Sequence, residues 1–310
     1  MKNRIYIQEV GVRDGFQSES IFVPTEVKVA LIDELSETGL AKIEVTAFVS
    51  PKAVPAMRDA PEVMEQIKRV PGVIYTALVP NVLGAERAIL GKADEINIFL
   101  SASESHNLAN VNKSTDASFE TFKDVMRAIE GTGVTVNGTV STSFGCPFEG
   151  HVDPARVLHF IERYLDLGVA GVTLADTTGM ANPTQVRTLA DMVYDCFPDV
   201  DLTLHFHNTR GMGLANVVAA LEAGCRRFDS SLGGIGGCPF APGATGNICT
   251  EDLVHMLWAM GYPTGTDLTK LIAASRRLPD IIGHDVPGQV RKAGKYTALH
   301  ALADTKPAKG

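Results

Sequence analysis

The segment 169-VAGVTLADTTGMANPTQVRTLADMVYDCFPDVDLTLHFH-207 has the pattern of a strand, a helix and a second strand. The β-rich runs 169–175 and 201–207 flank a helical pattern at 183–196 that begins at Asn182-Pro183. Proline fits the first turn of a helix, where its missing N–H is not needed. Two strands joined through a helix are typical of neighbouring parallel strands, so the stretch predicts a parallel βαβ unit.

The same alternation runs along the whole chain. Strands are predicted at 4–9, 42–48, 73–79, 94–100, 134–141, 169–175, 201–207 and 226–231, and helices at 24–38, 60–69, 82–91, 116–131, 153–167, 183–196, 212–223 and 245–260. Eight units in series without a linker predict an α/β fold, a (β/α)₈ TIM barrel. An open doubly wound sheet is the alternative, but no dinucleotide fingerprint follows the first strand. We expect a catalytic domain over residues 1–283, with an extra C-terminal helical segment at 266–279, and an irregular tail over 284–310.

The composition of the chain limits the classes of binding partner and the cellular compartment that we expect. The 310 residues carry a net charge of −8 and no basic run, which argues against nucleic acid or a membrane surface as the main partner. No apolar stretch is long enough for a transmembrane helix. The five cysteines include no Cys-x-x-Cys pair, which suits a reducing compartment. The strand pattern starts almost at once, without a signal peptide, so we expect a cytoplasmic enzyme.

Unusual polar residues follow the predicted strands at their C-terminal ends, where barrel enzymes carry their active sites. They are Glu9, Arg13, Asp14, Gln17, Glu44, Thr46, Thr173, Asp176, His205, His207, Cys238 and Asn247. Each also has a purely structural explanation, such as a loop ion pair, a charge at the barrel mouth or a helix cap. Their shared position at one barrel face favours an active site.

The sequence "TLHFHNTRG" at 203–211 indicates a metal site. Residues i and i+2 of a strand point to the same side, so His205 and His207 are expected to converge. With Asp14 they supply two imidazoles and one carboxylate, a set that suits a divalent cation with open positions for water and substrate. Oxygen ligands from substrate and water favour Mg²⁺ or Mn²⁺, while the histidines alone would also accept Zn²⁺. Two hydrogen-bonded histidines at a strand end are the alternative.

A glycine-rich stretch at 233–246 holds six glycines and Cys238. Its spacing matches neither the Walker nor the dinucleotide motif, so a mobile lid is favoured over a phosphate cradle. Cys238 is either a reactive thiol on this lid or a buried space-filling residue.

Three segments together, "EVGVRDGFQSE" (9–19), "HFHNTRG" (205–211) and "DSSLGGIGGCPFAPGATGN" (229–247), resemble the 3-hydroxy-3-methylglutaryl-CoA lyase family of metal-dependent barrel lyases, which are related to Claisen synthases. The similarity extends to about residue 260, and the glycine stretch with its cysteine is the most specific part. The resemblance implies a TIM barrel, an acyl-CoA substrate, a divalent metal cation and commonly a homodimer.

The resemblance also implies roles for individual residues. Asp14, His205, His207 and Asn247 would bind the cation. Arg13 would bind the thioester carbonyl, Glu44 would belong to the acid/base and metal shell, and Cys238 would protonate the product carbanion. We assign His205 as the first candidate for the base that deprotonates the substrate hydroxyl, and Gln17, Thr173 and Asp176 to substrate binding along with Arg13.

Some positions depart from the family pattern. Ser20 stands where relatives usually carry lysine, and Asn208 and Arg210 replace an aspartate and a tyrosine. These changes leave the expected metal ligands and the loop cysteine in place, but they affect which acyl group the substrate is expected to carry. The predicted function is retro-Claisen cleavage of 3-hydroxy-3-methylglutaryl-CoA, or a closely related 3-hydroxyacyl-CoA, to acetyl-CoA and a 3-oxo acid such as acetoacetate. A Claisen-type synthase or oxo-acid aldolase of the same group is the alternative, and a non-catalytic metal-binding scaffold is a second.

Overall fold

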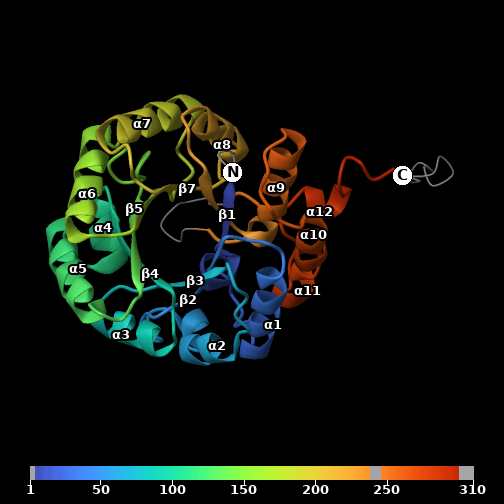
Figure 1. Cartoon of the computed structure of the whole chain (residues 1–310), viewed down its shortest axis with the longest axis horizontal. Helices are drawn as coiled ribbons and strands as arrows, with labels where there is room; N and C mark the ends of the chain where they lie inside the picture. The colour runs from blue at the N-terminus through green and yellow to red at the C-terminus, as the bar shows by residue number, and fades with distance from the viewer. Residues whose placement is uncertain (1–3, 238–245, 300–310) are drawn as a thin grey trace.

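A computed structural model describes residues 4–237 and 246–299 of the chain, and its strands close into a parallel barrel (Figure 1). The strand order is β1-β2-β3-β4-β5-β6-β7-β8, and β1 also pairs with β8 in parallel register. The strands are β1 (Tyr6–Glu9), β2 (Lys42–Ala47), β3 (Ile74–Leu78), β4 (Glu95–Ser101), β5 (Thr135–Ser141), β6 (Gly171–Asp176), β7 (Leu202–Phe206) and β8 (Arg227–Ser230). This confirms the predicted (β/α)₈ TIM barrel.

The helices surround the barrel and cover its outer face (Figure 1). They are α1 (Thr25–Ser36), α2 (Ala60–Gln66), α3 (Val82–Leu90), α4 (Glu104–Val111), α5 (Thr115–Ile129), α6 (Pro154–Leu167), α7 (Pro183–Cys196), α8 (Gly213–Glu222), α9 (Thr250–Ala259), α10 (Leu268–Arg276), α11 (Leu278–Ile282) and α12 (Val290–Ala293). Asn182 caps α7 by accepting a hydrogen bond from Gln185 N, with Pro183 in the first turn, as its sequence indicates. Apolar side chains of strands and helices form one continuous buried cluster between the two layers.

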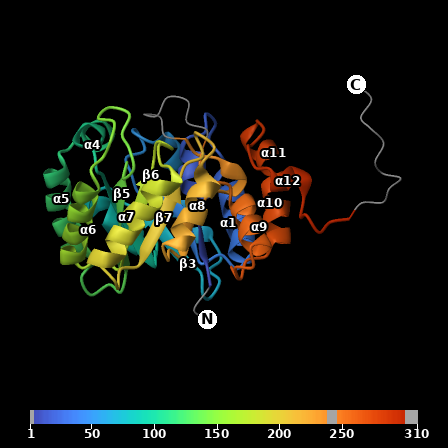
Figure 2. The same cartoon turned by 90° about the horizontal axis from the view of Figure 1, so that it is seen from above.

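The C-terminal helices form an additional group outside the barrel, next to α9 and α1 (Figure 2). The predicted segment 266–279 is helical but divides into α10 and α11. Pro279 lies in the first turn of α11, where a proline is tolerated, whereas inside one long helix it would remove a hydrogen bond. The four-residue helix α12 lies within the segment 284–310 that the sequence indicates as irregular.

Two short elements that position the site are absent from the predicted pattern. Residues Gly11–Gly15 form a single π-helical turn directly after β1. Residues 246–249, predicted as the start of a helix, instead run along the ends of β7 and β8, with bridges His207–Asn247 and Ser231–Cys249. The helix α9 therefore begins at Thr250. Helix α4 also lies in a segment that shows no clear helical period in the sequence.

No helix in the described parts of the chain is long and apolar enough to cross a membrane.

Candidate metal centre and active site

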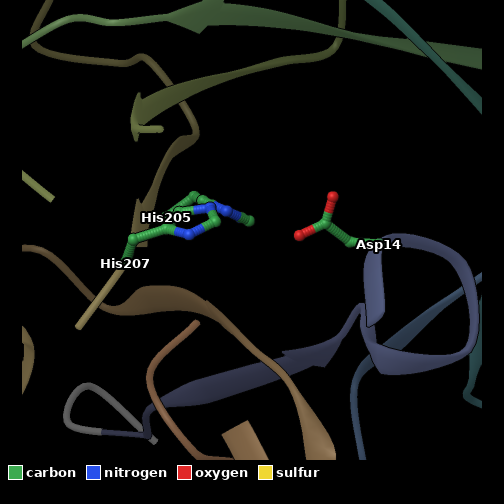
Figure 3. Close-up of side chains that lie close together, drawn as sticks. All are labelled: Asp14, His205 and His207. Carbon is green, nitrogen blue, oxygen red and sulfur yellow. The ribbon is translucent and has the colours of Figure 1, made fainter. Parts of the chain in front are cut away.

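The two histidines at the end of β7 face Asp14 (Figure 3). Their ring centroids are 5.1 Å apart, as expected for residues i and i+2 on one side of a strand. One ligand atom from each of Asp14, His205 and His207 lies within 4.8 Å of the others. This separation is close enough for one cation to bind all three, since hard-cation bonds measure about 2.0–2.6 Å.

Asp14 reaches the histidines from the π-helical turn after β1, whose ends are glycines. A Cβ atom on Gly11 would lie 2.7 Å from Glu9 Oε1, and one on Gly15 would lie 2.5 Å from Ile235 Cγ1. Both distances are too short for a side chain, so glycine lets this turn pack against the segment after β8. The sequence "GVRDG" thus places Asp14 at the barrel mouth.

Asn247 joins the three ligand residues. Its Nδ2 donates to Asp14 Oδ2 at 2.7 Å, and its Oδ1 is buried without a hydrogen-bond partner among the described residues. The site is crowded here too: a Cβ on Gly236 would lie 2.8 Å from Asn247 Nδ2, and one on Gly246 would lie 2.1 Å from Gly234 O. Gly236 and Gly246 thus permit close backbone packing around Asn247.

The buried unpaired atoms fit a cation. Besides Asn247 Oδ1, His207 Nδ1 is buried without a hydrogen-bond partner in the described chain. An amide oxygen and an imidazole nitrogen that receive no hydrogen bond are costly in a protein interior unless a ligand or water satisfies them. Together with the Asp14 carboxylate, they match the ligand chemistry of a divalent metal ion.

Arg13 links Asp14 to Glu44. Its Nη1 lies 2.8 Å from Asp14 Oδ1, and its Nε donates to Glu44 Oε2 at 2.5 Å. Burial opposes ionisation of Asp14, but the charges of Arg13 and His205 and the hydrogen bond from Asn247 outweigh it and hold the pKa of Asp14 well below its usual range. Burial raises the pKa of Glu44, although its pairing with Arg13 opposes this. Asp14 is therefore ionised and ready to bind a cation.

Asp229 orients His205. Its Oδ2 lies 3.2 Å from His205 Nδ1, which leaves Nε2 as the nitrogen available to a cation or a proton. Burial lowers the pKa of His205, but the hydrogen bond and charge of Asp229 and the charge of Asp14 outweigh this and raise it. Burial and the neighbouring His205 lower the pKa of His207 to about 3, which keeps its imidazole neutral.

A cavity of about 420 Å³ opens over this cluster. Of the predicted site residues, those that line it are Arg13, Asp14, Gln17, Thr173, His205 and His207. Its apolar wall includes Val49, Val54 and Leu78. The site residues from β1, β6 and β7 thus meet in one pocket, as the barrel topology predicts.

Comparison with known proteins gives the family. A family model described as HMGL-like matches residues 4–278. The chain belongs to this family.

Similar members are 3-hydroxy-3-methylglutaryl-CoA (HMG-CoA) lyases. The structure of an HMG-CoA lyase from Acinetobacter baumannii in complex with coenzyme A and 3-methylmalate is 51% identical, covers 97% of this chain and 99% of its own, and superposes with a TM-score of 0.94. Hydroxymethylglutaryl-CoA lyase from Bacillus subtilis is 44% identical over 92% of this chain and 96% of the relative. The mitochondrial hydroxymethylglutaryl-CoA lyase of Rattus norvegicus is 42% identical over 94% of this chain and 90% of the relative.

Glu44 and Asn247 do not line the cavity themselves but are hydrogen-bonded to Arg13 and Asp14, which do. The assignments of Asp176 and Cys238 differ from these. Asp176 does not line the cavity; its Oδ1 accepts from Met180 N at 2.7 Å and Ala181 N at 3.1 Å, so it closes the turn before α7. Burial raises the pKa of Asp176 to about 6. Cys238 lies outside the described residues. Cys146, in the similar string "FGCPFEG", is buried, with its Sγ 2.9 Å from Ser103 Oγ.

The spacing of Glu44 and Thr46 misled the sequence reasoning. Residues i and i+2 of a regular strand share one side, but the register of β2 with β3 shifts between Glu44 and Thr46. Glu44 contacts Arg13, whereas Thr46 Oγ1 faces Met57 Sδ at 3.7 Å. A β-bulge of this kind re-aims side chains next to an active site.

Sequence reasoning also missed Asp229 and Asn97, both of which line the cavity. Asp229 begins the string "DSSLGG" and could have been found from its place on the last strand, opposite His205 on the strand before. Asn97 is a polar residue inside the apolar run "EINIFL", a pattern that indicates an inward-facing polar group.

Proposed function

We propose that this protein is a divalent-metal-dependent carbon–carbon lyase that cleaves HMG-CoA, or a closely related 3-hydroxyacyl-CoA, to acetyl-CoA and a 3-oxo acid such as acetoacetate. The observation that carries the proposal is the convergence of Asp14, His205 and His207 beside Arg13 in one cavity, with Asn247 hydrogen-bonded to Asp14. Relatives that are HMG-CoA lyases, at 42–51% identity over most of the chain, support the same reaction.

Asp14, His205, His207 and Asn247 are the residues that would hold the cation, with Mg²⁺ or Mn²⁺ favoured by the two oxygen ligands. A bound cation would lower the pKa of the substrate hydroxyl and hold the reacting oxygen in place. Cleavage of the C2–C3 bond then requires a base for the hydroxyl proton, a positive group at the thioester oxygen and an acid for C2.

His205 serves as the base in this proposal. Asp229 accepts a hydrogen from Nδ1 and so leaves the lone pair on Nε2. One lone pair cannot hold a cation and take a proton together. For His205 to act as the base, the cation would have to be held by Asp14, His207 and Asn247.

Arg13 stabilises the thioester enolate as charge develops on its oxygen. A guanidinium has five N–H donors, and Arg13 directs Nε and one Nη2 hydrogen to Glu44 and one Nη1 hydrogen to Asp14. Two donors remain for the substrate. Glu44 and Asp14 thus fix the guanidinium in the cavity wall before substrate arrives. Cys238, by its place in the glycine stretch, is the proposed acid for C2.

The decisive assay uses purified protein with Mg²⁺ or Mn²⁺ against a panel of branched 3-hydroxyacyl-CoA thioesters. We expect acetyl-CoA and acetoacetate from HMG-CoA and loss of turnover with a chelator, restored by adding the metal back. Release of CoA from acetyl-CoA plus 2-oxo acids, without cleavage of any 3-hydroxyacyl-CoA, would instead identify a Claisen synthase. A protein that binds Mn²⁺ but turns over none of these compounds would be a scaffold.

We also propose that the protein is a cytoplasmic homodimer. Light scattering of the purified protein tests the dimer, and a single-chain mass would contradict it. Cell fractionation followed by immunodetection tests the location, and recovery in any fraction other than the cytosol would contradict that assignment.

A further inference from the structure

The side-chain amide of Asn247 has only one orientation that suits its surroundings. Its Nδ2 lies 2.7 Å from Asp14 Oδ2, 3.1 Å from Ile235 O and 3.4 Å from Gly236 O. Reversing the amide would place its oxygen against these three oxygens, so they must face the NH₂ group. Asn247 Oδ1 then points away from them and has no hydrogen-bond partner among the described residues. The backbone of residues 235 and 236 therefore determines which end of the amide is available to a cation.

These two carbonyl groups belong to a glycine turn, residues 232–236, that has little stiffness of its own. Gly233, Gly234 and Gly236 have positive φ angles of 68°, 77° and 96°. Glycine adopts such angles readily, but it also has the widest range of alternatives, so a turn rich in glycine keeps one shape only when other groups fix it. The contacts of the glycine turn with the rest of the chain therefore decide where its carbonyl groups lie.

Two buried carboxyl groups fix the start of the glycine turn. Glu9 Oε1 accepts a hydrogen bond from Leu232 N at 2.8 Å, and Glu251 Oε2 accepts one from Gly233 N at 3.0 Å. The two glutamates come from separate elements, the end of β1 and the first turn of α9. Both side chains are fully buried, and neither lines the cavity. Consecutive backbone N–H groups are thus held by two side chains that lie behind the site.

Glu251 joins the two segments whose relative position matters for Asn247. Asn247 and Glu251 lie on one segment, which runs along the ends of β7 and β8 into α9. The glycine turn, whose carbonyl groups face the amide, is the other segment. The hydrogen bond from Gly233 N to Glu251 is a side-chain link between them that does not involve Asn247 itself. Loss of this link would free the turn without touching Asn247 or Asp14.

We propose that Glu251 is a positioning residue for the metal site. By holding Gly233 it keeps the carbonyl groups of Ile235 and Gly236 against the Asn247 NH₂ group and so leaves Asn247 Oδ1 for the cation. This inference rests on the proposed function, which assigns Asn247 as a cation ligand. Groups that orient a metal ligand commonly contribute about 10–100-fold to metal affinity. Glu251 contacts neither the cation nor the substrate and acts through Asn247.

The test measures Mn²⁺ binding to the purified protein by calorimetry, without substrate. We expect Glu251→Leu, which has no acceptor for Gly233 N, to weaken Mn²⁺ binding about tenfold or more. Glu251→Gln keeps an oxygen acceptor on a side chain of the same length and should bind Mn²⁺ like the wild type. Asp267→Leu is the control, because Asp267 also accepts from backbone N–H groups, those of Thr269 and Lys270 at the start of α10. It should leave the affinity unchanged.

A double-mutant cycle separates the positioning role from a general loss of structure. Asn247→Ala should itself weaken Mn²⁺ binding, and adding Glu251→Leu to it should cause no further loss, because Glu251 acts through Asn247. Glu251→Asp, whose carboxylate is one carbon shorter and does not reach Gly233 N, should show the same loss and takes the place of Glu251→Leu if that variant does not fold. Equal losses with and without Asn247 would overturn the proposal, and so would wild-type affinity in Glu251→Leu.

The outcome is independent of the lyase assay, because Mn²⁺ binding is measured without turnover. A protein that loses Mn²⁺ affinity in Glu251→Leu only while Asn247 is present, yet cleaves no 3-hydroxyacyl-CoA, would refute the proposed function and leave the role of Glu251 standing. Cleavage of HMG-CoA by a protein whose Mn²⁺ affinity is the same in Glu251→Leu and the wild type would do the reverse.

Discussion

Glu9 connects the two segments that carry Asp14 and Asn247, and its replacement by glutamine leads to a quantitative prediction. The carboxylate is fully buried and accepts hydrogen bonds from Gly11 N at 2.7 Å, Leu232 N at 2.8 Å and Thr250 Oγ1 at 2.7 Å. Burial raises the pKa of Glu9 from 4.5 to about 7, and these hydrogen bonds offset only part of the effect. The neutral carboxyl group is therefore favoured in the folded protein.

The shift sets the sign and the size of the pH dependence. Between pH 4.5 and 7 the folded protein holds a proton at Glu9 that the unfolded chain has released. The stabilisation is present in full below pH 4.5 and is lost as the pH rises through 7. At 1.36 kcal/mol per pH unit, the difference between 4.5 and about 7 corresponds to roughly 3 kcal/mol of unfolding free energy.

Glu9→Gln replaces the titrating carboxyl group by an amide of nearly the same shape. The amide oxygen of glutamine accepts from Gly11 N and Leu232 N, and its NH₂ group donates to Thr250 Oγ1. We expect the variant to match the wild type in urea unfolding at pH 5 and to exceed its stability at pH 8, with circular dichroism as the readout. Glu62→Gln, on the exposed face of α2, is the control and should leave the pH profile unchanged. A constant difference between Glu9→Gln and the wild type across this pH range would refute the reasoning.

Four further predictions concern the site. Asp229→Asn should weaken Mn²⁺ binding about 10–100-fold in a calorimetric titration, because the carboxylate that holds the His205 ring in position is lost. Unchanged affinity would exclude that role. Arg13→Lys should lower kcat strongly and raise KM little, since lysine keeps the charge but loses the planar fork; the reverse pattern would make Arg13 a binding residue only. His207→Ala should abolish metal-dependent turnover while circular dichroism shows an intact fold, and residual turnover stimulated by Mg²⁺ would contradict its role as a ligand. Cys238→Ser should lose most of its turnover because an alcohol is a far weaker acid than a thiol, whereas Cys146→Ser should be mild, and near wild-type rates for both would place the proton donor elsewhere.

The barrel was predictable because its signals are local. Every predicted strand lies within two residues of an observed one at each end, since short β-rich runs between helical patterns recur at each unit. Asn182-Pro183 and similar pairs mark helix starts by their own chemistry. Helix α4 was not predicted because its apolar residues show little helical periodicity. Its only local signal is Ser103, which caps the helix by accepting a hydrogen bond from His106 N.

The cluster of Asp14, His205 and His207 was predictable for a related reason. Residues at the C-terminal ends of parallel strands meet at one face whatever the details of the loops, so topology alone brings Asp14 to His205 and His207. Glu44 and Thr46 show the limit of this reasoning, because the register shift in β2 depends on pairing with β3 and leaves no mark in the β2 sequence.

Asn247 shows how far a site can depend on contacts that no local pattern encodes. A helix was expected from residue 245, but Ile248 N donates to Phe206 O at 3.0 Å and Ser231 N donates to Ile248 O at 3.0 Å, so the backbone here is held by β7 and β8. The glycines at 236 and 246 have positive φ angles of 96° and 111°, and each lies where a side chain would collide with this segment or its neighbours. The glycines that suggest flexibility in the sequence therefore also permit close packing in the fold. That packing sets Asn247 against Asp14, so mutations at Gly236 or Gly246 should act on the metal site through backbone position rather than through lost mobility.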